Sequence, residues 1–444
     1  MVFFDTKAHN GELGTYAFEK RPDYSVDFKG MNNHFIRLNN LKPNTIYYFV
    51  IKDSEGQSKE YHFETLPDDP ETQLSIIAGG DSRNFRDARR SANQMVAKLR
   101  PHFVMFGGDM TGGDTGREWI NWMNDWQLTI SEDNRITPII ATRGNHEYSN
   151  RTVVELFDLP SPNAYYSLKM AGGLLQVYTL NSLIASGGEQ KEWLEADLKK
   201  NQHSSIWKMA QYHFPIRPHT VRKAERNDQR SNWASLFYKY GLDVAVESDA
   251  HVVKATYPIV PSYKDGHEEG FLRDDARGTV YLGEGCWGAP LRSNDDDKSW
   301  TRASGSFNQF KWMFVSPDGI EVRTVKTDQV ERVVALCDED RFTMPKGIDL
   351  WNPPSTGEVI YISDTTSNVL AVKTKKMKIE EFKVLAQAKG FHVSWVTYNE
   401  KENIIYDLQR ENKDGTYRSV AKIPGKGTAA NNNYTYLDLS LIHI

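Results

Sequence analysis

The sequence predicts an α/β protein with small all-β modules at both ends, and three observations lead to this fold class. Apolar runs alternate with amphipathic helical segments from about Gln73 to Thr327, which is the pattern of successive βαβ units. Period-two alternation of side chains marks antiparallel strands before Pro67. The same alternation returns after the Pro-containing segment from Trp351 to Gly357. At 444 residues the chain exceeds what one core usually supports.

Residues 1–68 are expected to form short antiparallel strands. The run from Leu41 to Phe49 places alternate side chains on one face, and a turn at 53–56 precedes a closing strand. This run resembles a fibronectin type III domain near its tyrosine corner, where the Tyr47 hydroxyl would bond upstream backbone. Such a domain needs about 90–100 residues, so we expect its leading strands to be missing.

Residues 73–350 are expected to form the central α/β domain. Its strand candidates are 73–80, 102–109, 137–147, 175–182, 205–213 and 242–251, and its helix candidates include 86–99, 117–130, 189–200 and 230–240. Five short motifs fall at the carboxyl ends of these strands: GGDSR, GGDM, GNHE, YHFP and SDAH. Loops at strand carboxyl ends gather ligands in α/β folds. We therefore expect the motifs to converge.

The five motifs supply six candidate metal ligands, which are Asp81, Asp109, Asn145, His213, Asp249 and His251. Three carboxylates, one amide oxygen and two imidazoles suit divalent zinc, manganese or iron better than calcium alone. A single Asp or His of this kind is more often structural. Five motifs in this order and at equivalent strand ends predict a metal centre.

The ordered motifs resemble those of the calcineurin-like metallophosphoesterases, and within them the purple acid phosphatases, from about Gln73 to Thr327. The resemblance implies a four-layer αββα sandwich and two divalent metal ions, with Fe, Mn or Zn as candidates. It also implies that Asp109 bridges the two ions. By the same resemblance one ion would be held by Asp81 and His251, and the other by Asn145, His213 and Asp249.

Phosphoester hydrolysis needs a hydroxide nucleophile, a clamp on the phosphoryl oxygens and help for the leaving alkoxide. Two metal ions about 3.5–4 Å apart supply these. The resemblance makes His146 the general acid or oxyanion donor. Asp114 is the candidate to orient His146 through its second ring nitrogen.

Three further side chains are candidates to contact phosphate. Arg83 and Arg143 each flank a ligand, and a guanidinium can grip phosphate in a bidentate manner. Either arginine could instead pair with a nearby carboxylate. His219 resembles a second His of purple acid phosphatases that contacts phosphate, with a surface-loop role as the alternative. Trp287 would be in reach of a substrate ring, although packing is the commoner role.

Three positions depart from the family pattern. Purple acid phosphatases carry a ferric-binding Tyr three residues after the bridging Asp, where this chain has Gly112, so no purple colour is expected. Many other relatives have His where this chain has Arg83. Asp249 replaces a family His, which favours manganese, magnesium, calcium or ferrous iron over zinc. Without a tyrosinate-bound ferric ion, we expect a neutral to alkaline pH optimum.

Composition and net charge limit the classes of partner that the protein is expected to bind. The net charge is -5 and no basic block stands out, which argues against nucleic acid. The longest apolar runs are far shorter than the roughly 20 residues of a transmembrane helix. Two cysteines cannot form a disulfide framework. The first ten residues lack the features of a signal peptide.

Residues 357–444 are expected to form a small β-sandwich whose strands include 359–365 and 368–374. The segment from Gly390 to Thr428 resembles the β-domain before the sorting tail of proteins exported by the type IX system of Bacteroidetes. A generic immunoglobulin-like module is the alternative. By analogy we expect an extracellular, cell-surface or periplasmic protein, with cell-surface attachment as one form of export. The oligomeric state stays open.

The sequence therefore predicts a metallophosphoesterase that hydrolyses small-molecule phosphomonoesters. A phosphodiesterase built on the same core is the close alternative. A surface-binding protein that has lost activity is the alternative of a different class, because Arg83, Gly112 and Asp249 depart from the family pattern.

Overall fold

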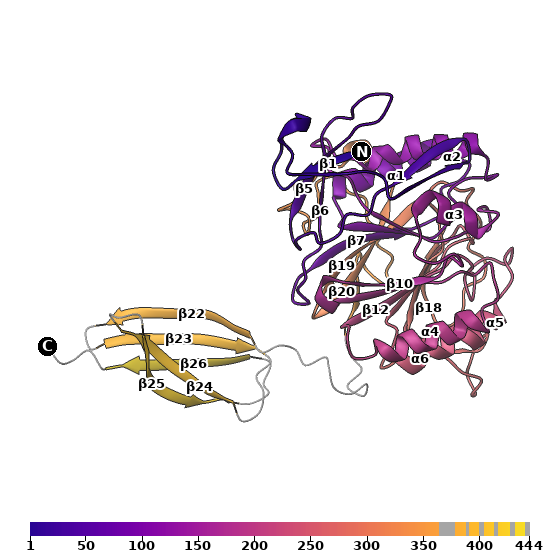
Figure 1. Cartoon of the computed structure of the whole chain (residues 1–444). Coiled ribbons are helices and arrows are strands. Elements are labelled where there is room, and N and C mark those ends of the chain that lie inside the picture. The colour runs from indigo at the N-terminus through magenta and orange to yellow at the C-terminus, as the bar shows by residue number, and fades with distance from the viewer. Residues whose placement is uncertain (364–377, 388–389, 399–403, 413–415, 427–430, 440–444) are drawn as a thin grey trace. The chain divides into compact units, whose positions relative to one another are not determined.

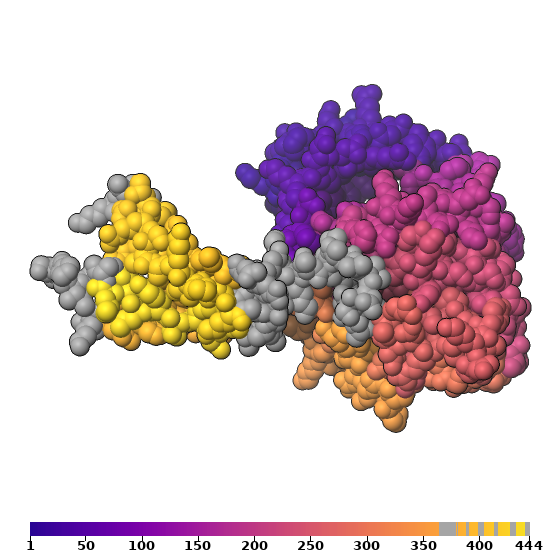
Figure 2. Space-filling model, turned by 90° about the horizontal axis from the view of Figure 1, so that it is seen from below, coloured from indigo at the N-terminus to yellow at the C-terminus, as the bar shows by residue number. Residues whose placement is uncertain are grey.

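The structure is a computed structural model that describes residues 1–363, 378–387, 390–398, 404–412, 416–426 and 431–439. The chain divides into two compact units, Met1–Val372 and Lys373–Ile444. The first unit holds an N-terminal β region and a central α/β body (Figure 1). In Figure 2 the N-terminal residues, in indigo, lie along one edge of that body.

Two mixed sheets form the central body. The first has the strand order β21-β20-β19-β7-β8-β9, and the second has the order β10-β11-β12-β13-β17-β14-β18. The strands of the first sheet are β7 (Leu74–Gly79), β8 (Phe103–Phe106), β9 (Ile139–Ala141), β19 (Gln309–Ser316), β20 (Gly319–Lys326) and β21 (Ile360–Ile362). Those of the second are β10 (Tyr166–Met170), β11 (Leu175–Thr179), β12 (Trp207–Gln211), β13 (Val244–Val246), β14 (Val253–Thr256), β17 (Val280–Gly283) and β18 (Thr301–Gly305). A separate hairpin joins β15 (Ile259–Pro261) to β16 (Phe271–Arg273).

The two sheets pack on each other and helices cover their outer faces. Figure 1 shows α1 (Arg86–Leu99) and α2 (Gly116–Trp126) on one side, with α4 (Glu189–Lys200) and α6 (Ser235–Tyr240) on the opposite side. Strands β7, β8, β11, β12 and β13 are buried along their whole length, as expected for strands between layers. The predicted four-layer αββα sandwich is therefore confirmed. The remaining helices are α3 (Asn150–Phe157) and α5 (Asn227–Gln229).

The helices start and end close to their predicted limits. Helix α1 has the predicted bounds and ends at Arg100 in the left-handed region, with φ 49°. Helix α2 begins one residue early because Thr115 and Glu118 form a capping box. After Trp126 the chain continues as a 3₁₀ turn, so this helix is shorter than predicted.

The N-terminal region is built from β1 (Val2–Asp5), β2 (Phe18–Lys20), β3 (Tyr24–Phe28), β4 (Met31–Phe35), β5 (Ile46–Ile51) and β6 (Tyr61–Glu64). These strands form the sheet β2-β1-β5-β6 and the separate hairpin β3-β4. The Lys42 N–H donates to the Tyr47 hydroxyl at 2.9 Å, which is the upstream bond expected for a tyrosine corner. The assignment to fibronectin type III stays a prediction.

The second unit consists of β22 (Lys378–Gln387), β23 (Gly390–Tyr398), β24 (Ile405–Glu411), β25 (Tyr417–Pro424) and β26 (Asn431–Asp438). Strands β22, β23 and β26 form one antiparallel sheet, and β24 pairs with β25. The predicted strand at 359–365 belongs to the first unit, because β21 pairs with β20. The predicted boundary at 357 is therefore corrected. The strand predicted at 368–374 lies outside the described residues.

Across the described parts of the chain, no helix combines the length and the apolar character that a membrane crossing requires.

Candidate metal centre

The two sheets bring the five motifs to one edge of the central body. Strands β7, β8 and β9 run parallel in the first sheet. Strands β12 and β13 run parallel in the second. Each motif begins at the end of one of these strands or follows it within a few residues. Distant segments of sequence therefore meet at the carboxyl ends of the strands.

All six candidate ligands come together. Asp81, Asp109 and His251 offer ligand atoms that lie within 4.8 Å of one another, and Asp109, His213 and Asp249 form a second such group. Asn145 joins the second group, because its Oδ1 lies 3.1 Å from His213 Nε2. Asp109 alone belongs to both groups, which is the arrangement expected of a bridging carboxylate.

The two histidines turn their Nε2 atoms toward the carboxylates. His213 Nδ1 donates to the Gly107 carbonyl at 2.8 Å, and His251 Nδ1 donates to the Pro290 carbonyl at 2.7 Å, because a carbonyl oxygen can only accept. The Nε2 atoms then lie 3.3 Å from Asp109 Oδ1 and 3.1 Å from Asp81 Oδ1. Holding one ring nitrogen with a carbonyl and leaving the other for a cation is typical of metal-binding histidines.

The carboxylates of the site favour a bound positive charge. Burial lowers the pKa of His213, but the carboxylates of Asp109, Asp81 and Asp249 outweigh it and raise that pKa to about 10. Asp109 Oδ2 is buried and has no hydrogen-bond partner among the described residues, although the Arg83 guanidinium lies 3.4 Å away. A divalent cation would replace the proton on His213 and satisfy Asp109 Oδ2, so these residues fit a metal pair.

The backbone of the centre is strained and closely packed. Asp81, Asp109, Asp249 and His251 have φ between 55° and 64°, a region that costs non-glycine residues about 1–3 kcal/mol each and recurs at functional sites. At Gly107 a Cβ would lie 2.0 Å from Ser248 Oγ. Only glycine lets these two ligand loops approach so closely.

Glu147 supports the bridging carboxylate and was not singled out by the sequence. Its buried carboxylate accepts hydrogen bonds from the N–H groups of Asp109, Met110 and Gly144 at 2.7–2.9 Å. Burial and the charge of Asp109 raise the pKa of Glu147 to about 7. The last residue of the GNHE motif thus joins the loops after β8 and β9.

His146 faces the centre, but Asp114 does not orient it. His146 Nε2 lies 3.8 Å from Asp109 Oδ2, and His146 Nδ1 bonds the Gly112 carbonyl at 2.5 Å. Asp114 instead pairs with Lys29 Nζ at 2.8 Å and accepts hydrogen bonds from the Trp119 ring, the Thr152 hydroxyl and the Tyr148 N–H. The role predicted for Asp114 is therefore corrected.

The three candidate phosphate contacts have different outcomes. Arg83 Nε lies 3.4 Å from Asp109 Oδ2, at the centre. Arg143 donates to the Glu147 carbonyl at 2.9 Å and to Asn150 Oδ1 at 2.6 Å, so it is occupied within its own loop. This prediction is corrected.

His219 is buried among neighbouring side chains. Its side chain is fully buried, and its Nε2 shares a 2.7 Å hydrogen bond with the Thr301 hydroxyl. Its ring lies edge-on to Trp300. Its Nδ1 has no hydrogen-bond partner among the described residues, so the role predicted for His219 stays a prediction. Trp287 is fully buried as well and donates to Asn93 Oδ1 at 2.8 Å, so it has the packing role.

Two basic residues at the centre escaped the sequence analysis. Lys223 Nζ lies 2.5 Å from Asp249 Oδ1, and Arg292 Nη1 donates to the Asp249 carbonyl at 2.6 Å. Neither residue belongs to one of the five motifs. The sequence signals are VRKAER, which places Arg222 and Lys223 shortly after the YHFP motif, and GEGCWGAPLR, which ends at Arg292.

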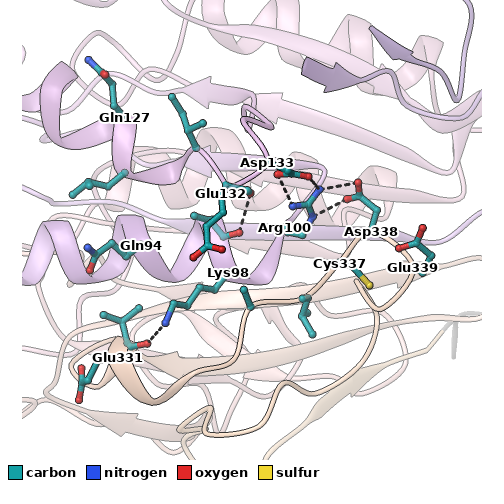
Figure 3. A pocket seen from close by; sticks show the side chains of 17 residues that line it. Gln94, Lys98, Arg100, Gln127, Glu132, Asp133, Glu331, Cys337, Asp338 and Glu339 are labelled. Atoms are coloured by element: carbon teal, nitrogen blue, oxygen red, sulfur yellow. Dashed lines mark hydrogen bonds and ion pairs between the residues drawn. The ribbon is translucent and has the colours of Figure 1, made fainter. Parts of the chain in front are cut away.

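A separate pocket of about 800 Å³ lies beside α1 and residues 330–339 (Figure 3). Lys98 Nζ donates there to the Val330 carbonyl at 2.8 Å. Arg100 pairs with Asp133 and Asp338, each at 2.8 Å. None of the six candidate ligands lines this pocket, so it is distinct from the metal centre.

Comparisons with known proteins agree with this geometry. Residues 73–253 match the family model of the calcineurin-like phosphoesterases. Purple acid phosphatase 15 of Arabidopsis thaliana is 26% identical over 262 residues, which cover 49% of this chain and 48% of that protein. Purple acid phosphatase 21 of the same plant is 25% identical over 245 residues, which cover 51% and 54%. The chain spans about half the length of these curated relatives.

Solved structures show the same fold at low sequence identity. The purple acid phosphatase PPD1 of yellow lupin superposes with a TM-score of 0.53 at 17% identity, over 69% of this chain and 62% of that one. PhoD superposes with a TM-score of 0.54 at 12% identity, over 77% and 81%. Residues 73–253 are therefore similar to the calcineurin-like phosphoesterases, and the chain is similar to plant purple acid phosphatases over about half its length.

Proposed function

We infer that the protein is a metal-dependent phosphoester hydrolase that acts on small-molecule phosphomonoesters. The observation that carries this proposal is the position of Asp109. Its carboxylate belongs to both groups of candidate ligands, and its Oδ2 is buried without a hydrogen-bond partner in the described structure. The family match over residues 73–253 supports the same reaction class.

The proposed ligand sets divide the centre in two. Asp81, Asp109 and His251 would hold one divalent cation, and the other would be held by Asp109, Asn145, His213 and Asp249. When bound, the two cations lower the pKa of water and neutralise charge on the phosphoryl oxygens. Iron, manganese and zinc are the candidates, and the carboxylate of Asp249 favours manganese or ferrous iron at the second position.

His146 is the proposed proton donor to the leaving alkoxide. Because its Nδ1 donates to the Gly112 carbonyl, its Nε2 donates a proton only from the imidazolium form. The Nε2 lies 3.8 Å from Asp109 Oδ2, and the side chain is 24% exposed, so a substrate can reach it. Arg83 is the proposed phosphoryl clamp, since its guanidinium lies beside Asp109 and geometry suits bidentate contact.

Assays on a matched pair of substrates distinguish a phosphomonoesterase from a phosphodiesterase. Protein reconstituted with manganese or iron is assayed on 4-nitrophenyl phosphate and on bis(4-nitrophenyl) phosphate. We expect the larger kcat/KM for the monoester. The reverse ratio would assign the protein as a phosphodiesterase. Two bound metal ions without turnover of either ester would favour the surface-binding alternative.

We also propose that the protein acts outside the cytoplasm, either free or attached to the cell surface. The support is the resemblance of its terminal β regions to modules of exported proteins. Expression of the full-length gene in its own host, followed by fractionation, tests this: activity confined to the cytoplasm would contradict it.

A further inference from the structure

The loop that carries Lys223 is fixed to the buried interior. Near its start, the Ile216 N–H donates to Glu247 Oε1 at 2.9 Å, and the His219 N–H donates to Glu284 Oε2 at 3.2 Å. Buried Lys254 pairs with both carboxylates, each at 2.5 Å. The loop closes where the Arg226 N–H donates to the Ile216 carbonyl at 3.0 Å. Its position is therefore set by the fold.

Lys223 extends from this loop to the metal centre. Its N–H donates to the Thr220 carbonyl at 3.2 Å, and this turn returns its side chain to Asp249, 2.5 Å away. The side chain is 24% exposed. An ammonium fixed at one end and open to solvent can bind an anion as well as its carboxylate partner.

Arg292 approaches the same ligand from the other side. Its N–H donates to the His251 carbonyl at 3.1 Å, and its guanidinium donates to the Asp249 carbonyl at 2.6 Å. The pKa of Arg292 is lowered, first by burial and also by the charges of Arg83 and Arg222, although Asp249 and Asp81 oppose this shift. Four basic side chains therefore share the region around Asp249.

A charge count indicates more positive charge than one phosphate needs. Two divalent cations would outweigh the three carboxylates by one charge, and the hydroxide nucleophile would cancel that charge. Adding the nearest three basic side chains gives a surplus of about three. A phosphomonoester brings only about two negative charges. In this count the three carboxylates are those of Asp81, Asp109 and Asp249. The three basic side chains are those of Arg83, Lys223 and Arg292.

We propose that Lys223 and Arg292, with Arg83 and the exposed Arg222, bind a second anionic group of the substrate. The preferred substrate class is then a phosphate ester that carries another phosphate, rather than an ester with a neutral leaving group. This inference rests on the proposed hydrolase function. The rival explanation is that Lys223 only neutralises Asp249, the carboxylate that stands in place of a family histidine.

Fructose 6-phosphate and fructose 1,6-bisphosphate provide the test, because they differ by one phosphate. We expect kcat/KM of the metal-loaded wild type to be about tenfold higher for the bisphosphate, the scale of one charge-assisted contact. In Lys223→Gln and Arg292→Gln this preference should fall to about twofold, which is the statistical factor for a substrate with two phosphate esters. The loss should appear as a higher KM for the bisphosphate. Lys223→Arg should restore it.

The matched control is Lys239→Gln, which removes a lysine paired with Glu195 on the outer helices. It should keep the wild-type preference. Calorimetric binding of the bisphosphate to metal-loaded His146→Ala protein gives an independent readout, and the added Lys223→Gln change should weaken that binding about tenfold.

The outcomes separate this inference from the proposed function. Turnover of 4-nitrophenyl phosphate without a bisphosphate preference would overturn only the anion site. A preference that survives in Lys223→Gln and Arg292→Gln, with metal content reduced in Lys223→Gln, would also overturn it and leave Lys223 as a neutralising partner of Asp249. Failure to hydrolyse any ester with both metals bound would overturn the hydrolase itself.

Discussion

His146 has its two ring nitrogens in different surroundings. The Gly112 carbonyl fixes Nδ1, and Nε2 is directed toward the centre. If Nε2 supplies the proton for the leaving group, His146→Ala should lower kcat for 4-nitrophenyl phosphate by about 10²–10⁴-fold with metal content unchanged. His34→Ala, in the N-terminal hairpin, is the control and should retain wild-type kcat. A fully active His146→Ala protein would remove this residue from the mechanism.

Gly112 occupies the position of the tyrosine that gives purple acid phosphatases their colour. A glycine has no phenolate to bind ferric iron, so the reconstituted protein should lack a visible charge-transfer band. We expect its pH-rate profile to peak at neutral or alkaline pH, because no tyrosinate-bound ferric ion acidifies the bound water. A maximum below about pH 5.5 would contradict this, since the profile reports the essential acid and base.

At the scale of elements, Asp114 joins the β3–β4 hairpin to α2 and α3. It pairs with Lys29, accepts from Trp119 and Thr152, and holds the Tyr148 N–H beside the GNHE loop. Asp114→Ala would leave these buried donors unpaired, so the free energy of unfolding should fall by about 2–4 kcal/mol. Urea denaturation followed by tryptophan fluorescence measures this.

The same variant distinguishes support from direct orientation of His146. At a temperature where Asp114→Ala is fully folded, kcat should fall by less than about tenfold. A loss as large as that of His146→Ala, without loss of stability, would restore the direct role. Asp27→Ala, an exposed acid of the same hairpin, should change stability by less than about 0.5 kcal/mol.

The strands, the helices and the candidate metal ligands could be predicted from the sequence for a physical reason. Buried parallel strands require continuous apolar runs, and their carboxyl ends require loops, so both leave local signals. The partners of Asp114 and His219 leave none, because each is decided by a contact with a distant segment. Lys223 and Arg292 were missed for the same reason, since a basic residue outside a motif reads as solvated surface.

The β21 strand illustrates the same limit. Its apolar run predicts a strand, but nothing in residues 360–362 indicates that it completes the sheet of β19 and β20 instead of beginning the C-terminal module. An isolated short strand takes its partner from tertiary packing.

At the scale of the first unit, Asp338 joins three distant segments. It pairs with Arg100 at 2.8 Å and with Arg341 at 2.5 Å, and Arg341 reaches Glu64 of β6 at 2.8 Å. Burial raises the pKa of Asp338, but the hydrogen bonds from Arg100 and Arg341 outweigh it and hold that pKa well below its usual range. The cluster connects the N-terminal sheet to the central body.

A depressed carboxyl pKa stabilises the folded state above the unfolded pKa of about 4 and loses that contribution as pH falls toward the folded pKa. Asp338→Asn should therefore lower the free energy of unfolding by about 2–4 kcal/mol at pH 7. The difference in free energy of unfolding between this variant and the wild type should become smaller as pH is lowered from about 5 to 3. The control is Asp275→Asn, because Asp275 forms an ion pair with Arg273 that is exposed to solvent. A difference that grows in acid would contradict this account.

Metal stoichiometry tests the central claim most directly. Elemental analysis of protein reconstituted with manganese or iron should find about two ions per chain, with 4-nitrophenyl phosphatase activity appearing as the second ion binds. Asp109→Asn should lose the second ion and the activity together, because its carboxylate belongs to both ligand groups. A wild-type chain that binds one ion or none, or an Asp109→Asn protein that keeps two ions and full activity, would contradict the account.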